Sequence, residues 1–68
     1  MSLIKRSFSL AGHRTSVALE PESWQALAAC ASVRGITLAR LVAEIDHARG
    51  AGRPLASALR VFALAEPK

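Results

Sequence analysis

The sequence has a single cysteine, Cys30, among its 68 residues. One thiol excludes an internal disulfide, and a zinc site built mainly from cysteines is excluded for the same reason. No apolar run approaches the ~20 residues that a membrane span requires. The basic residues near the N-terminus are followed by no hydrophobic segment, so we expect no signal peptide. A lone cysteine also fits a reducing compartment, and we expect a cytoplasmic protein.

Groups of residues that carry out chemistry are missing as well. Ser16 and Ser23 have no nearby base, and neither lies in the G-x-S-x-G pattern of hydrolases. Asp46 and His47 are adjacent in a predicted helix and therefore face different directions. His13 has no second ligand at a suitable spacing. We therefore expect no enzyme, no metal site and no cofactor.

The length limits the fold to one small domain, residues 1–68. A chain this short buries a modest share of its surface, and such domains commonly gain stability from disulfides, a metal or a partner chain. Since the first two are excluded, association with a second copy is expected.

The net charge is +4, and the basic residues are mostly arginine. Residues 1–19 contain Lys5, Arg6 and Arg14 and no acid, whereas residues 20–68 contain six basic and five acidic residues. The positive charge is therefore concentrated at the N-terminal end, which favours an acidic partner, with nucleic acid first. The basic residues do not gather on one face of an amphipathic helix, so we expect no membrane partner.

The N-terminal region, residues 4–19, has the alternation of a β-ribbon. Residues 4–10 alternate in part, Ala11-Gly12 has the composition of a turn, and residues 13–19 alternate throughout. The second segment places Thr15, Val17 and Leu19 on one face and Arg14, Ser16 and Ala18 on the other.

Three helices are predicted after this region, over residues 21–34, 37–49 and 55–65. Pro21 suits a first helical turn, Gly35 suits a helix end, and Thr37 suits an N-cap. The third helix is apolar nearly all round, which indicates burial of more than one face. The predicted dimer core consists of Val17, Leu19, Trp24, Leu27, Leu38, Leu41, Val42 and Ile45.

A single strand of seven residues needs a partner strand, and the simplest partner is its twin in a second chain. The resulting two-stranded antiparallel ribbon fits the major groove of DNA. Arg14, Ser16 and Ala18 would then contact bases. Backbone N–H groups of Thr37 and Leu38, at the start of a helix, would bind phosphate. An alternative is that residues 4–10 pair with residues 13–19, which makes a four-stranded sheet in the dimer.

The order of these elements resembles the ribbon-helix-helix family, the MetJ/Arc type of DNA-binding dimer. The resembling segment spans residues 14–48, from Arg14-Thr15-Ser16-Val17 through Arg34-Gly35-Ile36-Thr37-Leu38 to the second helix. Lys5-Arg6-Ser7-Phe8 and Ala58-Leu59-Arg60-Val61-Phe62 also resemble a bacterial subfamily of short ribbon-helix-helix proteins.

The resemblance implies a mainly α fold with a short N-terminal β-ribbon, an intertwined homodimer and an extra C-terminal helix. It further implies a transcriptional regulator that reads double-stranded DNA with the ribbon. Because the outward face has one long polar side chain, Arg14, we expect Lys5, Arg6 and His13 to add phosphate contacts. A second hypothesis is a dimeric protein-interaction module that binds another protein through residues 55–65, without specific DNA binding.

Overall fold

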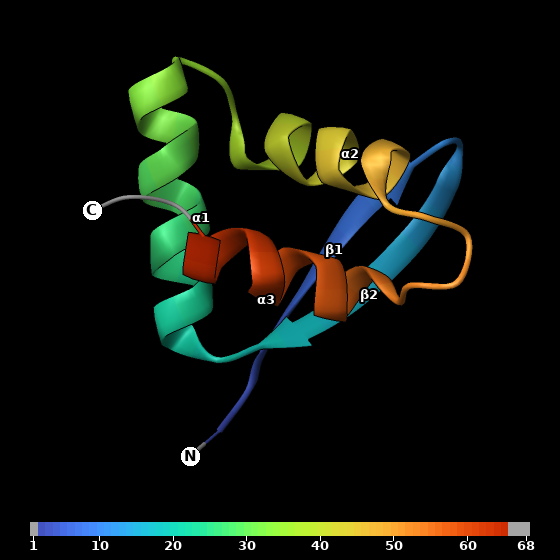
Figure 1. The fold of residues 1–68 in the computed structure, drawn as a ribbon, viewed down its shortest axis with the longest axis horizontal. Helices are drawn as coiled ribbons and strands as arrows, with labels where there is room; N and C mark the ends of the chain where they lie inside the picture. The colour runs from blue at the N-terminus through green and yellow to red at the C-terminus, as the bar shows by residue number, and fades with distance from the viewer. Residues whose placement is uncertain (1, 66–68) are drawn as a thin grey trace.

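The computed structural model describes residues 2–65 and contains a β-hairpin followed by three helices. The strands are β1 (Ile4–Leu10) and β2 (His13–Leu19). The helices are α1 (Pro21–Arg34), α2 (Leu38–Ala48) and α3 (Leu55–Ala65), and all of them lie on one side of the hairpin (Figure 1). The predicted N-terminal ribbon and the extra C-terminal helix are confirmed.

The hairpin forms within one chain, as in the alternative in which residues 4–10 pair with residues 13–19. β1 pairs antiparallel with β2 in a register that runs from Ile4 opposite Leu19 to Leu10 opposite His13. Two residues connect the strands, Ala11 at φ 51° and Gly12 at φ 82°. Positive φ at both positions is the geometry of a type I′ turn, whose twist matches that of paired strands. The turn therefore brings residues 4–10 alongside β2, as the four-stranded alternative requires.

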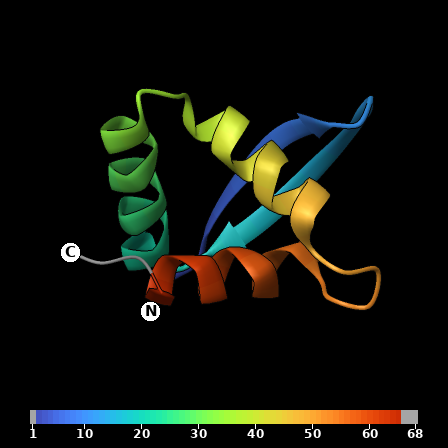
Figure 2. The same cartoon turned by 45° about the horizontal axis from the view of Figure 1, so that its top comes forward.

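The helix ends follow from local chemistry. Pro21 occupies the first turn of α1, and Gly35 ends that helix with φ 71° while its N–H donates to the carbonyl oxygen of Ser32 at 3.1 Å. At the start of α2, the Thr37 hydroxyl accepts a hydrogen bond from the backbone N–H of Arg40 at 3.0 Å. These caps set the sharp turn between α1 and α2 that is seen in Figure 2.

The core lies between the inner face of the hairpin and the three helices. The indole N–H of Trp24 donates to the Ile4 carbonyl oxygen at 2.8 Å, which ties β1 to α1. Among the predicted core residues, Leu38 is half-buried and the other seven are buried within this one chain. The buried apolar residues that the prediction omitted are Leu10, Cys30, Ala31, Leu55, Ala58 and Leu59.

An ion pair fixes α3 to the start of α1. The Arg60 guanidinium lies 3.0 Å from a carboxylate oxygen of Glu20. The hydrogen bond from Arg60, with help from a backbone hydrogen bond and from the positive charge, lowers the pKa of the Glu20 carboxyl. Leu55 and Leu59 of α3 point into the core, whereas Val61 is 51% exposed and Leu64 is 87% exposed.

Leu41 has no exposed surface, so truncation of its side chain leaves a cavity in the core. We expect Leu41→Ala to lower the free energy of unfolding by about 2–5 kcal/mol in urea denaturation. The control is Val33→Ala, because Val33 is 88% exposed and its truncation removes little packing. We expect the control to change the free energy by less than about 0.5 kcal/mol. Equal losses in the two variants would contradict a core that closes around Leu41.

Candidate nucleic-acid interface

The two faces of the hairpin differ in their environment. Residues directly opposite each other in the register share a face, and successive residues alternate between faces. The inner face contains Ile4, Arg6, Phe8, Leu10, His13, Thr15, Val17 and Leu19, and it packs toward the helices except at its exposed end, His13. The outer face contains Lys5, Ser7, Ser9, Arg14, Ser16 and Ala18.

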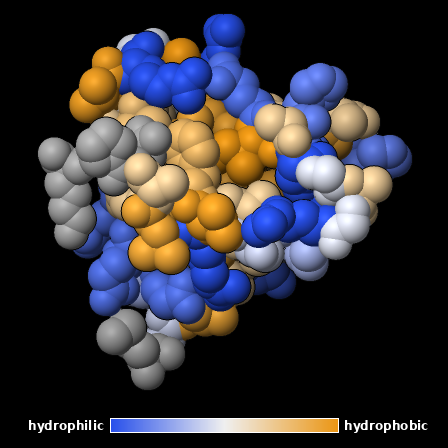
Figure 3. Space-filling model, in the orientation of Figure 1, coloured by the Kyte–Doolittle hydropathy of each residue, from blue (hydrophilic) through white to orange (hydrophobic). Residues whose placement is uncertain are grey.

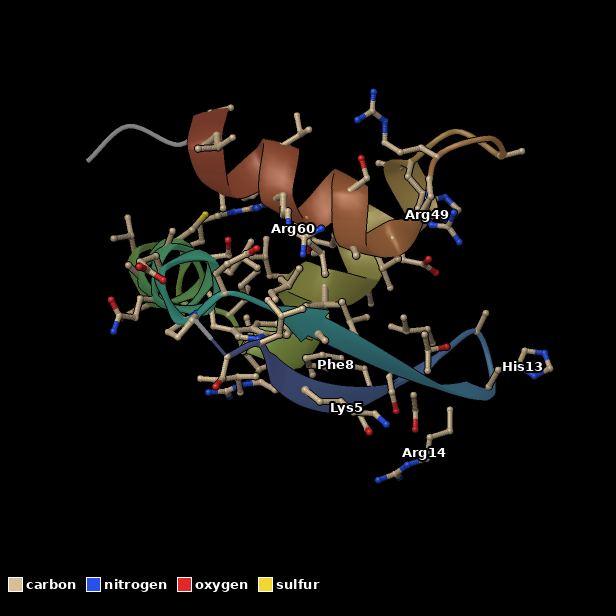
Figure 4. The ribbon with its side chains drawn as sticks, turned by 90° about the horizontal axis from the view of Figure 1, so that it is seen from below. Lys5, Phe8, His13, Arg14, Arg49 and Arg60 are labelled. Carbon is tan, nitrogen blue, oxygen red and sulfur yellow. The ribbon has the colours of Figure 1, made fainter. Side chains whose placement is uncertain are left out.

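The outer face is polar and positively charged, and none of the helices α1, α2 and α3 covers it (Figure 4). Lys5 and Arg14 extend from it on the side away from the helices (Figure 4). Between them, the Ser7 and Ser16 hydroxyls lie 2.9 Å apart and hydrogen-bond across the strands. No acidic residue lies on this face. It therefore presents short hydroxyl groups flanked by cations, which suits hydrogen bonding to phosphates and base edges.

Within residues 2–65, no acid forms an ion pair with the basic side chains of the hairpin. Four arginines on or next to the helices pair with acids, at N···O distances of 2.8–3.4 Å. Within residues 2–65, the basic side chains that have no ion pair are Lys5, Arg6, Arg14 and Arg53. Three of these four belong to the hairpin, so the field of the protein is most positive there.

Arg6 lies on the inner face, apart from Lys5 and Arg14. Its guanidinium carbon is 5.4 Å from the centroid of the Trp24 ring, a cation–π geometry. The Phe8 and Trp24 ring centroids are 5.8 Å apart, so Arg6 and Phe8 both pack near the indole. The structure therefore gives Arg6 a packing contact and does not bring it together with the outer-face cations.

The other predicted phosphate contacts lie at two separate places. His13 begins β2 at the exposed tip of the hairpin, next to the turn (Figure 4). Thr37 and Leu38 lie at the start of α2, in the helix layer and beside the end of α1 (Figures 1 and 2). The Thr37 hydroxyl is occupied by its own helix cap. Of the predicted DNA contacts, the outer face unites Lys5, Arg14, Ser16 and Ala18.

Ser7 and Ser9 complete the outer face, although the sequence analysis did not include them among the contact residues. The partial alternation of residues 4–10 was the sequence pattern that could have identified them, because it places Ser7 and Ser9 opposite Ser16 and Arg14 once the two strands pair.

In residues 2–65 no group of three or more His, Cys, Asp or Glu side chains could hold a metal ion. No single helix there is long and apolar enough to cross a bilayer, although α1 and α2 pass that test as a pair bent by 101°.

A family model for the ribbon-helix-helix domain matches residues 3–66. The chain belongs to the ribbon-helix-helix family. Ribbon-helix-helix proteins are generally DNA-binding transcription regulators that form homodimers. The matched range includes β1 and α3, so the hairpin and the C-terminal helix are both part of this ribbon-helix-helix domain. Comparison with curated proteins and with solved structures gives no match.

The turn of this ribbon-helix-helix hairpin offers a test of its geometry. Ala11 has φ 51°, a left-handed conformation that asparagine adopts more readily than alanine. We expect Ala11→Asn to raise the free energy of unfolding by about 0.5–1 kcal/mol in urea denaturation, since it relieves this strain.

The matched control is Ala51→Asn, in an exposed loop where the residue has no positive φ. We expect the control to change the free energy by less than about 0.5 kcal/mol. A stabilisation of the same size at both positions would mean that the Ala11 backbone is not the source.

Proposed function

We propose that this protein is a homodimeric, cytoplasmic DNA-binding regulator that places the outer face of its hairpin in the major groove. The observation that carries this proposal is the outer face itself, which bears Lys5 and Arg14, has no acid and is left uncovered by the helices. The general function of the ribbon-helix-helix family supports it.

The free edge of β2 supplies the dimer contact in this proposal. In a hairpin with a two-residue turn, the closing pair Leu10 and His13 exchanges backbone hydrogen bonds, and every second pair after it does the same. The backbone groups of Arg14, Ser16 and Ala18 therefore face away from β1. An exposed strand edge of this kind is a template for another strand. Two copies joined there form a four-stranded sheet with the two β2 strands at its centre.

This sheet suits DNA through its central pair of strands. A two-stranded ribbon fits the major groove, which is about 12 Å wide, whereas four strands at a spacing of ~4.8 Å span ~14 Å. The β2 strands therefore enter the groove, and the flanking β1 strands lie over the phosphates.

Four outer-face residues have proposed contacts that match their chemistry. Arg14 donates two hydrogen bonds to a guanine edge, Ser16 bonds to a neighbouring base, and Ala18 contacts a thymine methyl group. Lys5, on the flanking strand, binds phosphate. His13 belongs to the inner face by its register, but it is exposed at the end of the hairpin, where it adds a second phosphate contact. Arg6, Thr37 and Leu38 lie outside this surface, and we leave them out of the proposed contacts.

Arg14 is the residue whose loss tests base contact. We expect Arg14→Ala to weaken binding by about 1–3 kcal/mol, which is about 5-fold to 150-fold, while circular dichroism shows an unchanged fold. Affinity is measured by fluorescence anisotropy on fragments selected from genomic DNA, at salt concentrations from about 50 to 200 mM.

The control for this experiment is Arg40→Ala, which removes the same charge from α2, where the Arg40 side chain is 69% exposed. We expect the control to keep most of the affinity, because α2 packs in the core against the inner face of the hairpin, with Leu10 and Val17. An equal loss of DNA affinity in the Arg14→Ala and Arg40→Ala variants would mean that Arg14 contributes only general electrostatic attraction and makes no base contact.

The dimer contact is tested by proline, which lacks the N–H that an edge strand offers. We expect Ser16→Pro to convert the dimer into a monomer in sedimentation equilibrium, because the Ser16 N–H faces the free edge of β2. The control is Ser7→Pro, because its N–H faces the free edge of β1 and both variants lose the same Ser7–Ser16 hydrogen bond. A dimer that survives Ser16→Pro would place the contact elsewhere.

The exposed face of α3 favours a second candidate function. Val61 is 51% exposed and Leu64 is 87% exposed, so this helix offers apolar surface to another protein. An intact dimer that shows no salt-sensitive DNA binding, but binds a partner through residues 55–65, would favour this protein-interaction module over the regulator.

A further inference from the structure

A groove lies between α2 and α3, in the helix layer and away from the outer face of the hairpin. Its volume is about 320 Å³, and its apolar floor includes Ile45, Ala58, Val61 and Phe62, with the buried Leu41 beneath them. In Figure 3, apolar side chains gather over α3 and the gap between α3 and α2, with hydrophilic side chains around them. The groove is therefore an apolar hollow with a charged border.

The border of the groove is positive. Its arginines are Arg34, Arg49 and Arg53, and its one acid is Glu44. Glu44 is already engaged, because Arg34 lies 3.1 Å and Arg40 lies 3.4 Å from its carboxylate oxygens.

Arg49 and Arg53 differ in how far they are neutralised. Arg49 pairs with Asp46 at 2.8 Å and donates a hydrogen bond to the carbonyl oxygen of Arg53. Within residues 2–65, Arg53 has no ion pair, and it lies in the exposed loop between α2 and α3. The groove thus combines an apolar floor with one uncompensated guanidinium at its border.

We propose that this groove binds a small aliphatic carboxylate, with its chain on the floor and its carboxylate on Arg53. The volume falls at the lower end of the ~300–1,000 Å³ that is typical of small-molecule sites. The floor is mainly aliphatic, which suits an acyl chain. A guanidinium presents paired N–H donors that match the two oxygens of a carboxylate.

Other occupants fit this groove less well. A two-fold contact with a second copy would set the same arginine border against itself, and like charges would repel. A nucleic-acid backbone would leave the apolar floor without apolar contacts. A neutral apolar molecule would leave the guanidinium of Arg53 without an anion.

The test uses the full chain and decanoate as the probe, followed by the methyl NMR signals of Ala58 and Val61. Decanol and decyltrimethylammonium, which have the same chain with no charge and with the opposite charge, are the ligand controls. We expect saturable shifts that are confined to the groove, with decanoate binding at least about tenfold more tightly than the cation, since a hydrogen bond to a charged group contributes about 1.5–3 kcal/mol.

Two variants and a matched control locate the two halves of the site. Arg53→Gln should weaken decanoate binding by about tenfold and leave decanol binding unchanged. Arg14→Gln removes the same charge from the outer face of the hairpin and should leave the binding of both decanoate and decanol to the groove unchanged. Ala48→Phe fills the groove from the exposed end of α2 and should abolish binding of both probes while the rest of the spectrum stays native.

Three results would overturn the proposal. The first is shifts that do not saturate or that spread over the whole surface. The second is an equal effect of Arg53→Gln and Arg14→Gln on decanoate binding. The third is groove signals that follow the protein concentration and ignore decanoate, which would show that a second copy covers the groove. None of these results depends on DNA binding, so the two proposals fail independently.

Discussion

The pairing of β1 with β2 inside one chain is the interaction on which the other features depend. It fixes which side chains face the helices, because a shift of one residue in the register would exchange the two faces of a strand. With the observed register, Val17 and Leu19 close the core while Arg14 and Ser16 stay outside. The same pairing leaves one edge of β2 free, so the proposed dimer adds strands to an existing hairpin instead of completing a missing one.

The distribution of charge follows from where the acids lie. Glu20, Glu44 and Asp46 each pair with an arginine near them in space, at the start of α1 and along α2. The hairpin has no acid of its own. Of the four basic side chains in residues 2–65 without an ion pair, three therefore lie on the hairpin, two of them on its outer face, and the fourth, Arg53, lies at the groove. Charge alone would not have distinguished these two places, because both contain arginine.

Local patterns predicted the parts of the fold that depend on near neighbours. Residues 13–19 alternate and form a strand, and the apolar stripe of α2 is buried. Gly35 and Thr37 cap the helices at the positions that the sequence predicts. Residues 4–10 alternate only in part, because Arg6 falls on the inner face, where alternation predicts an apolar residue. Its position has a tertiary cause, the Trp24 ring, which no spacing in the sequence reveals. The Glu20–Arg60 pair joins residues 40 apart, and local patterns contain no trace of such a contact.

The outer face and the groove lie on opposite sides of the same core. Ile45 on the groove floor and Leu41 beneath it belong to the buried cluster that also contains Leu10 and Val17 of the hairpin. Close-packed side chains transmit displacement, because such a core has little free volume to absorb it. Linkage then sets a strict condition on the two proposed sites. If DNA changes the affinity of the groove for a carboxylate, the carboxylate changes the affinity for DNA by the same factor. A carboxylate that binds the DNA-free and the DNA-bound protein with equal affinity would occupy the groove without changing the affinity of the hairpin for DNA.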